Sequence, residues 1–213
     1  MKTRYYFYIL IFVVAILYLI GFKNKSKAYK IFSLFLIFDV LMNYISDELY
    51  SWFRIYNHFF INIIFLFQFG ILSLFYSYSF EDKKWRNVVE ISLILVSSYL
   101  LIKYLVFPES FFLLHYWDIY LTIFPIIVYG VVYLYNEYEK PQELYYANLA
   151  LLIHFIIYFF CYLSWPLHSI SLQHDYMEEF NDTFSIYTIN LGYITYVVYS
   201  IILLYQLKKL KTK

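Results

Sequence analysis

Seven apolar segments follow one another along the chain, and a helix needs roughly 20 such residues to cross the hydrocarbon core of a membrane. They cover approximately residues 5–22, 31–49, 56–75, 88–106, 111–135, 144–165 and 184–205. Short charged or turn-forming stretches separate them, which is typical of helix ends. The sequence therefore predicts an all-α, polytopic transmembrane helix bundle with seven spans, formed as a single transmembrane domain over residues 1–213.

The composition agrees with a chain that lies in lipid. The sequence is 63% hydrophobic and 15% charged, whereas a soluble domain is nearer half apolar and one-quarter charged. A chain of 213 residues is too short to bury that much apolar surface in one soluble core. The basic residues occur in separate short clusters, so nothing points to a nucleic-acid partner. With Cys161 as its single cysteine, the sequence has neither an intrachain disulfide nor a cysteine-based metal site.

Lysine and arginine residues predict the orientation. With seven spans, 12 of them lie on the side that holds the C-terminus and 4 on the side that holds the N-terminus. Because basic residues favour the cytoplasmic side, we expect the N-terminus outside and the C-terminus in the cytoplasm. The first segment follows Lys2 and Arg4 as a signal peptide would, but it lacks a small-residue cleavage site and precedes a lysine cluster. It is therefore expected to stay in the membrane.

The second segment contains FDVLMNYISDELY, which places Asp39 inside the predicted membrane span. A carboxylate near the middle of a transmembrane helix costs about 3 kcal/mol on insertion scales. From the helical rise, Asp39 lies about 12 Å from the cytoplasmic start of its helix and His154 about 15 Å from the start of the sixth. We therefore expect the two groups to pair if their helices face the same interior.

Four predicted helices carry polar residues on one face, at helical spacing. They are Asp39, Asn43 and Asp47 in the second helix, His58 and Asn62 in the third, His154 and Tyr158 in the sixth, and Tyr187 and Asn190 in the seventh. Because lipid exposure of these groups is costly, the pattern predicts an outward-facing polar pocket with Asp39 and His154 as its floor. The alternative is that they only hold helices together, at about 0.6 kcal/mol each.

Pro125 lies inside the fifth predicted helix. It removes one backbone hydrogen bond and frees the carbonyl of Leu121, so we expect a kink. The kink is either a functional hinge or a bend with no further role.

The predicted outer loops contain histidines and carboxylates that could together bind a divalent metal. These residues are His115, Asp118, His168, His174 and Asp175. Seven-helix hydrolases of the ceramidase and adiponectin-receptor type hold zinc near one membrane face, but their spaced histidine pairs do not map cleanly onto this sequence. The other interpretation is an exterior loop that is poor in basic residues. No other cofactor is evident, and a retinal protein is not expected, because the last segment has no lysine before Lys208.

Three stretches carry a resemblance across most of the chain: FDVLMNYISDELY, RIYNHFFINIIF and LIHFIIYFFCYL. They resemble a group of short bacterial seven-helix membrane proteins that has no assigned activity. The resemblance implies a multi-pass protein of the cell membrane, specifically the bacterial inner membrane.

The leading functional hypothesis is that the protein senses or transports a small solute or proton through the polar pocket, with Asp39 as the buried titratable group. The second is an accessory or scaffold subunit without its own activity, acting through a separate membrane or cytoplasmic partner protein. The third is a metal-dependent membrane hydrolase. In each case the lipid bilayer surrounds the chain.

Overall fold

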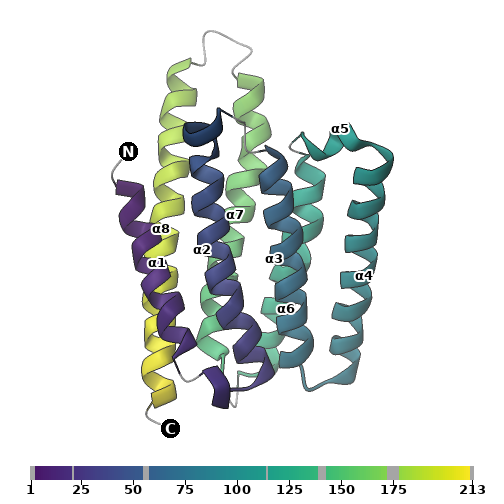
Figure 1. The fold of residues 1–213 in the computed structure, drawn as a ribbon, viewed down its shortest axis with the longest axis vertical. Coiled ribbons are helices and arrows are strands. Elements are labelled where there is room, and N and C mark those ends of the chain that lie inside the picture. Colours follow the sequence, from purple (N-terminus) through teal and green to yellow (C-terminus); the bar gives the residue numbers. More distant parts are fainter. Residues whose placement is uncertain are drawn as a thin grey trace.

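The computed structural model describes residues 3–20, 22–54, 58–113, 115–138, 143–171 and 178–211, and these form helices without a strand. The elements are α1 (Thr3–Leu19), the 3₁₀ helix η1 (Phe22–Asn24), α2 (Lys27–Phe53), α3 (His58–Ser79), α4 (Lys83–Val106), α5 (Pro108–Phe111), α6 (Tyr116–Asn136), α7 (Tyr145–Ser171) and α8 (Glu178–Lys211). All but η1 and α5 run along the length of the bundle (Figure 1). The prediction of an all-helical chain is confirmed.

Five helical segments among the described residues are long and apolar enough to cross a membrane. They are Lys27–Leu49, His58–Ser79, Lys83–Val106, Tyr116–Asn136 and Asn190–Leu210. Two apolar segments in α1 and α7, Tyr5–Leu19 and Tyr145–Cys161, are shorter. In α4 only 11% of the apolar window is buried inside the protein, so most of its side chains face outward, as lipid contact requires. The structure thus agrees with a helical membrane bundle.

Several predicted helix ends are corrected. The first helix ends at Leu19 rather than at residue 22, and the lysine cluster begins inside η1 with Lys23. The predicted fifth helix does not start at residue 111, because Pro108 opens the separate short helix α5 and α6 begins only at Tyr116. Proline suits the first turn of a helix, where its missing N–H has no partner to lose. The helices α2, α7 and α8 extend beyond the predicted segments, to Phe53, Ser171 and Lys211 respectively.

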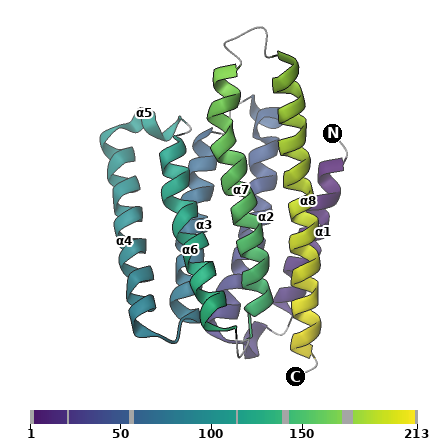
Figure 2. The ribbon, with the colours of Figure 1, turned by 180° about the vertical axis from the view of Figure 1, so that it is seen from behind.

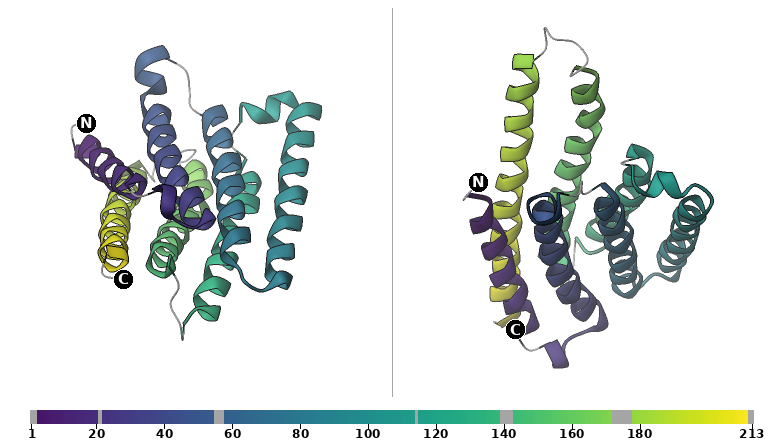
Figure 3. Two further views of the ribbon diagram at one scale, coloured as in Figure 1. Left: turned by 60° about the horizontal axis from the view of Figure 1, so that its bottom comes forward. Right: turned by 45° about the horizontal axis from the view of Figure 1, so that its top comes forward.

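The long helices form two layers, with α1, α2 and α3 in one and α8, α7 and α6 behind them (Figures 1 and 2). Each helix packs on the next in the order α1, α2, α3, α6, α7, α8, and α8 packs back on α1, which closes a ring of six helices. Helix α4 lies outside this ring against α3 and α6 (Figure 3).

The ring consists of two triplets, α1–α2–α3 and α6–α7–α8, with the same order and the same chain directions (Figure 1). By position in the ring and by chain direction, α1 therefore corresponds to α6, α2 to α7 and α3 to α8. The central helices of the triplets, α2 and α7, carry Asp39 and His154 respectively.

Aromatic side chains fill much of the interior. Among the largest fully buried side chains are Tyr18, Tyr29, Tyr76, Tyr133, Tyr199, Phe32, Phe35, Phe69 and Phe75. Tyr18 joins the two triplets, because its hydroxyl donates to the backbone carbonyl of Leu203 at 3.1 Å. Its ring packs on Tyr29 and Phe32 with centroid distances of 5.5 and 5.4 Å. Such aromatic pairs contribute about 0.5–1.5 kcal/mol beyond their burial.

A polar junction fixes α3, α6 and α7. The hydroxyl of Tyr76 donates to Oδ1 of Asn148, and Nδ2 of Asn148 donates to the carbonyl of Gly130 at 3.0 Å. A Cβ atom at position 130 would lie 3.1 Å from the Tyr76 hydroxyl and 3.3 Å from Cδ1 of Leu152. Glycine therefore allows the close approach of α6 on which the junction depends.

The first turn of α7 is held by a side chain of α8. Gln206 is buried, and its Oε1 accepts from the backbone N–H of Tyr146 at 2.9 Å while its Nε2 donates to the carbonyl of Glu143. We expect Gln206→Leu to lower the free energy of unfolding by about 1–2 kcal/mol, because two backbone groups lose a buried partner. Unfolding in mixed detergent micelles measures this. Ile201→Leu, at an exposed position of α8, is the control, and equal stability of the two variants would contradict the expectation.

Candidate functional site

Asp39 lies inside the ring with only 3% of its surface exposed. Its Oδ1 accepts two hydrogen bonds, from Nε2 of Gln68 on α3 at 2.6 Å and from Nδ2 of Asn43 at 3.0 Å. Within the described residues no cation pairs with Asp39, and no donor reaches its Oδ2. Neutral amides stabilise a buried carboxylate but do not compensate its charge, and burying an uncompensated charge is costly. The group is therefore suited to binding a proton or a solute that donates hydrogen bonds or carries positive charge.

His154 enters the same interior from α7, in the opposite layer, and is 4% exposed. Its ring packs on Tyr158, Tyr196 and Tyr199, with centroid distances of 4.6, 5.2 and 5.2 Å. The hydroxyls of Tyr158 and Tyr196 are 3.2 Å apart. These tyrosines come from α7 and α8, so the second triplet contributes a histidine surrounded by phenols.

Two buried tyrosines of α8, Tyr196 and Tyr199, belong to the His154 half of the site. The rings of both tyrosines pack on His154. No hydrogen bond or ion pair joins Asp39 directly to His154 in the described part of the chain. The two groups thus share one interior without the direct pairing that we considered. We call Asp39, Asn43, Gln68, His154, Tyr196 and Tyr199 the interior cluster.

Three buried polar atoms of the interior cluster have no hydrogen-bond partner among the described residues. They are Oε1 of Gln68, Nδ1 of His154 and the hydroxyl of Tyr199. Buried polar atoms in proteins are nearly always paired, with protein or with water. One acceptor, one imidazole nitrogen and one hydroxyl therefore lack hydrogen-bond partners in the interior that also holds the Asp39 carboxylate. Bound water or a small polar ligand would supply those partners.

Some predicted pocket residues have other partners. Asn62 is buried, but its Nδ2 donates to the carbonyls of Phe111 and Leu113 at 2.9 and 2.8 Å, which ties α3 to the end of α5 and the residues after it. Asp47 is exposed and accepts from the hydroxyl of Tyr8 at 2.6 Å, which links α2 to α1.

Further predicted residues lie at exposed positions. His58, Tyr187 and Asn190 are exposed, and Tyr187 is 70% exposed. Of the predicted pocket, the structure shows two pairs, Asn43 bonded to Asp39 on α2 and Tyr158 packed on His154 on α7, and one shared pocket stays a prediction. Helix α6 continues without interruption through Pro125, and a hinge at this residue stays a prediction.

Sequence reasoning missed Gln68, Tyr196 and Tyr199. Gln68 had a usable signal, because it is the only amide in the middle of an otherwise apolar stretch, IIFLFQFGIL. The two tyrosines had none, since they are 2 of 28 tyrosines in the chain and nothing in their spacing distinguishes them.

The predicted metal ligands do not assemble within the described residues, where no group of three or more His, Cys, Asp or Glu side chains comes together. Asp118 is instead ion-paired with Lys103 at 2.6 Å, and His115 precedes the first turn of α6. His168 lies in α7, but its side chain is not described, and His174 and Asp175 lie outside the described residues. The metal site stays a prediction.

Comparisons with protein families, with curated proteins and with solved structures each find no match for this chain. Its class therefore rests on its own architecture: a helical membrane protein with several helices of membrane-crossing length. A buried cluster of polar side chains lies between two triplets of helices.

Proposed function

We propose that this protein crosses the membrane seven times, with its N-terminus outside and its C-terminus in the cytoplasm, and that it transports or senses a small polar solute or a proton through the interior cluster. The bacterial inner membrane is the proposed location, from the resemblance of the three sequence stretches given above.

The distribution of charge supports this topology. Basic residues gather at the end of the bundle where α2 and α4 begin and α8 ends (Figure 1). They include Lys23, Lys25, Lys27, Lys30, Lys83, Lys84, Arg86, Lys208 and Lys209. At the opposite end the described segments contain Arg4, Arg54 and Lys103. Because lysine and arginine remain on the cytoplasmic side of short loops, the end that is rich in lysine is the cytoplasmic one.

The observation that carries the functional proposal is the uncompensated Asp39 inside a ring of helices that also holds three buried polar atoms without a partner among the described residues. An intramembrane carboxylate without a cation is costly, and in membrane proteins such groups mark proton and solute pathways. The cluster also lies where the two triplets meet. Transporters are often built from repeats and bind their substrates between them, near the middle of the bilayer.

The second candidate, an accessory subunit, has an observation of its own. Asn62, Asp47 and Asn148 bond neighbouring helices, as expected of polar groups that only hold a bundle together. Under that candidate Asp39 and Gln68 would be one more such contact. The third candidate, a metal-dependent hydrolase, depends on the predicted metal ligands of the outer loops. Two of these ligands, His174 and Asp175, lie outside the described residues.

The test is a flux assay in proteoliposomes under an imposed pH gradient, comparing the native chain with Asp39→Asn at matched incorporation. We expect Asp39→Asn to lower proton flux at least tenfold, because the amide cannot exchange a proton. Asp47→Asn is the matched control, since it removes an exposed acid from the same helix and should leave flux unchanged.

Two results would contradict proton transport. One is flux through Asp39→Asn equal to that of the native chain, and the other is no flux through well-folded native protein. A second assay, the uptake of small polar solutes into the same vesicles, then separates solute transport from an accessory role. Solute uptake that depends on Asp39 supports the proposal, and its absence favours the accessory subunit.

A further inference from the structure

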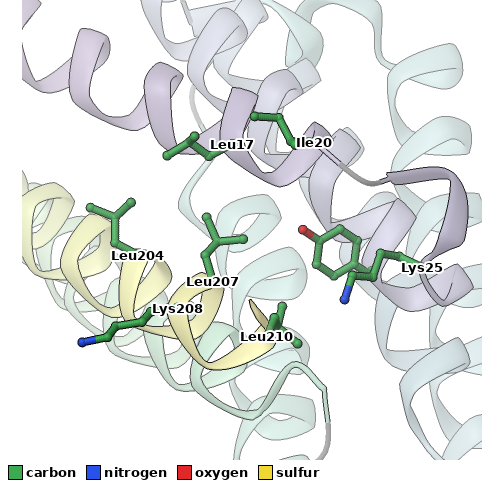
Figure 4. Close-up of a pocket in the computed structure, with 8 residues that line it drawn as sticks. Leu17, Ile20, Lys25, Leu204, Leu207, Lys208 and Leu210 are labelled. Carbon is green, nitrogen blue, oxygen red and sulfur yellow. The ribbon is translucent and has the colours of Figure 1, made fainter. Parts of the chain in front are cut away.

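A second site lies apart from the interior cluster, between α1, the start of α2 and the end of α8. It is a pocket of about 380 Å³ at the lysine-rich end of the bundle. Leu17 of α1 and Leu204 and Leu207 of α8 form apolar walls, and Lys25 and Lys208 lie on opposite sides of them (Figure 4). The volume falls in the range of pockets that bind small ligands.

The pocket has an apolar part followed by a basic part, which matches the acyl chain and the phosphate of a phospholipid. Leu17 and Leu204 belong to the apolar parts of their helices, whereas Lys25 lies in the turn before α2 and Lys208 near the end of α8. An acyl chain can therefore lie against the leucines while a phosphate lies level with the ammonium groups. Lysines at the end of a helix reach the level of the lipid headgroups in this way.

The charges favour an acidic lipid over a zwitterionic one. Lys25 is paired with Glu143 at 3.2 Å, but both side chains are about one-third exposed, and such ion pairs contribute about 0–1 kcal/mol. A phosphate can therefore share or replace this weak partner. Basic pockets between transmembrane helices on the cytoplasmic side are known to bind acidic headgroups.

We propose that the Leu17–Leu204–Leu207 pocket binds one membrane phospholipid with a net negative headgroup, whose phosphate lies between Lys25 and Lys208. The proposal uses the membrane orientation proposed above, but it does not depend on transport through the ring. Lipid binding and flux are separate measurements, so either proposal can fail while the other stands.

Native mass spectrometry tests the proposal, with the purified full chain released from nanodiscs that contain equal amounts of phosphatidylglycerol and phosphatidylcholine with the same acyl chains. We expect the native chain to retain one phosphatidylglycerol preferentially. Lys25→Gln together with Lys208→Gln should weaken this retention about 25-fold, since each lysine near an acidic headgroup contributes about fivefold.

Two further variants separate the pocket from general surface charge. Lys83→Gln with Lys84→Gln removes the same charge from the same end of the bundle, at the exposed start of α4, and should retain the lipid. Leu204→Trp fills the pocket from a side chain that is 39% exposed, keeps every charge and should lose the lipid. Two results would overturn the proposal. One is equal retention of the two lipids by the native chain, and the other is an equal loss of phosphatidylglycerol in the Lys25/Lys208 and Lys83/Lys84 double variants.

Discussion

Replacing Lys103 by methionine should lower the free energy of unfolding by about 3–5 kcal/mol, because it leaves a buried carboxylate without its cation. Nζ of Lys103 on α4 lies 2.8 and 2.6 Å from the two carboxylate oxygens of Asp118 on α6. The hydroxyl of Tyr104 donates to the same carboxylate at 3.1 Å. The Asp118 side chain is 4% exposed and that of Lys103 is 18% exposed, so water can do little to replace the lost partner.

The matched variant is Lys103→Met combined with Asp118→Leu. Removing both charges of a buried pair is often close to neutral, so the double variant should recover most of the stability that Lys103→Met loses. Unfolding in mixed detergent micelles measures the free energies of the native chain, of Lys103→Met, of Asp118→Leu and of the double variant. If the losses at the two positions simply add, the ion pair does not hold α4 to α6. Since α4 packs only on the outside of the ring, this pair is a principal polar attachment of α4 among the described residues.

Asn148→Leu should cost about 2–3 kcal/mol of unfolding free energy. The substitution deprives the buried Tyr76 hydroxyl and the Gly130 carbonyl of their partner, and an unpaired buried polar group costs about 1–3 kcal/mol. It also places a branched side chain beside position 130, where there is little room. The effect should exceed that of an average interhelical hydrogen bond in a membrane, about 0.6 kcal/mol, because one side chain serves three helices.

Tyr76→Phe is the companion variant, because it removes one hydroxyl and leaves the aromatic ring in place. We expect Tyr76→Phe alone to lower the free energy of unfolding by about 1 kcal/mol. In the Asn148→Leu background it should lower it by less, because the effects of two substitutions in one hydrogen-bond network do not add. Full additivity of the two substitutions in the same unfolding titration would show that the two side chains act independently and would contradict the junction.

Much of the fold could be predicted from hydropathy and charge. In lipid every backbone polar group needs a partner within the protein, and a helix supplies those partners inside one segment, so a long isolated apolar run is expected to be helical. The structure has a long helix at each predicted segment, and it differs chiefly at helix ends, such as the one near Pro108, where turn chemistry decides. The depths of Asp39 and His154 in the membrane stay predictions, because they depend on where each helix enters the lipid, and α2 begins at Lys27 rather than at residue 31.

The partners of these residues were decided by tertiary structure. Helices in lipid gain no hydrophobic energy by turning one apolar face inward rather than another, so the polar faces read from the sequence did not say which neighbour each would meet. Asn62 and Tyr187 illustrate this: one ties α3 to the region of α5 and the other is exposed.

The hydropathy pattern of the sequence likewise did not indicate the order in which the six helices pack around the ring. The sequence by itself determined a helical membrane chain, because hydropathy and backbone satisfaction are local properties of each segment. Only the packed structure decided that α4 lies outside the ring, that α2 opposes α7, that Gln68 bonds Asp39, and that Tyr196 and Tyr199 pack on His154. Those contacts depend on shape complementarity between helices far apart in sequence, and no single segment carries that information.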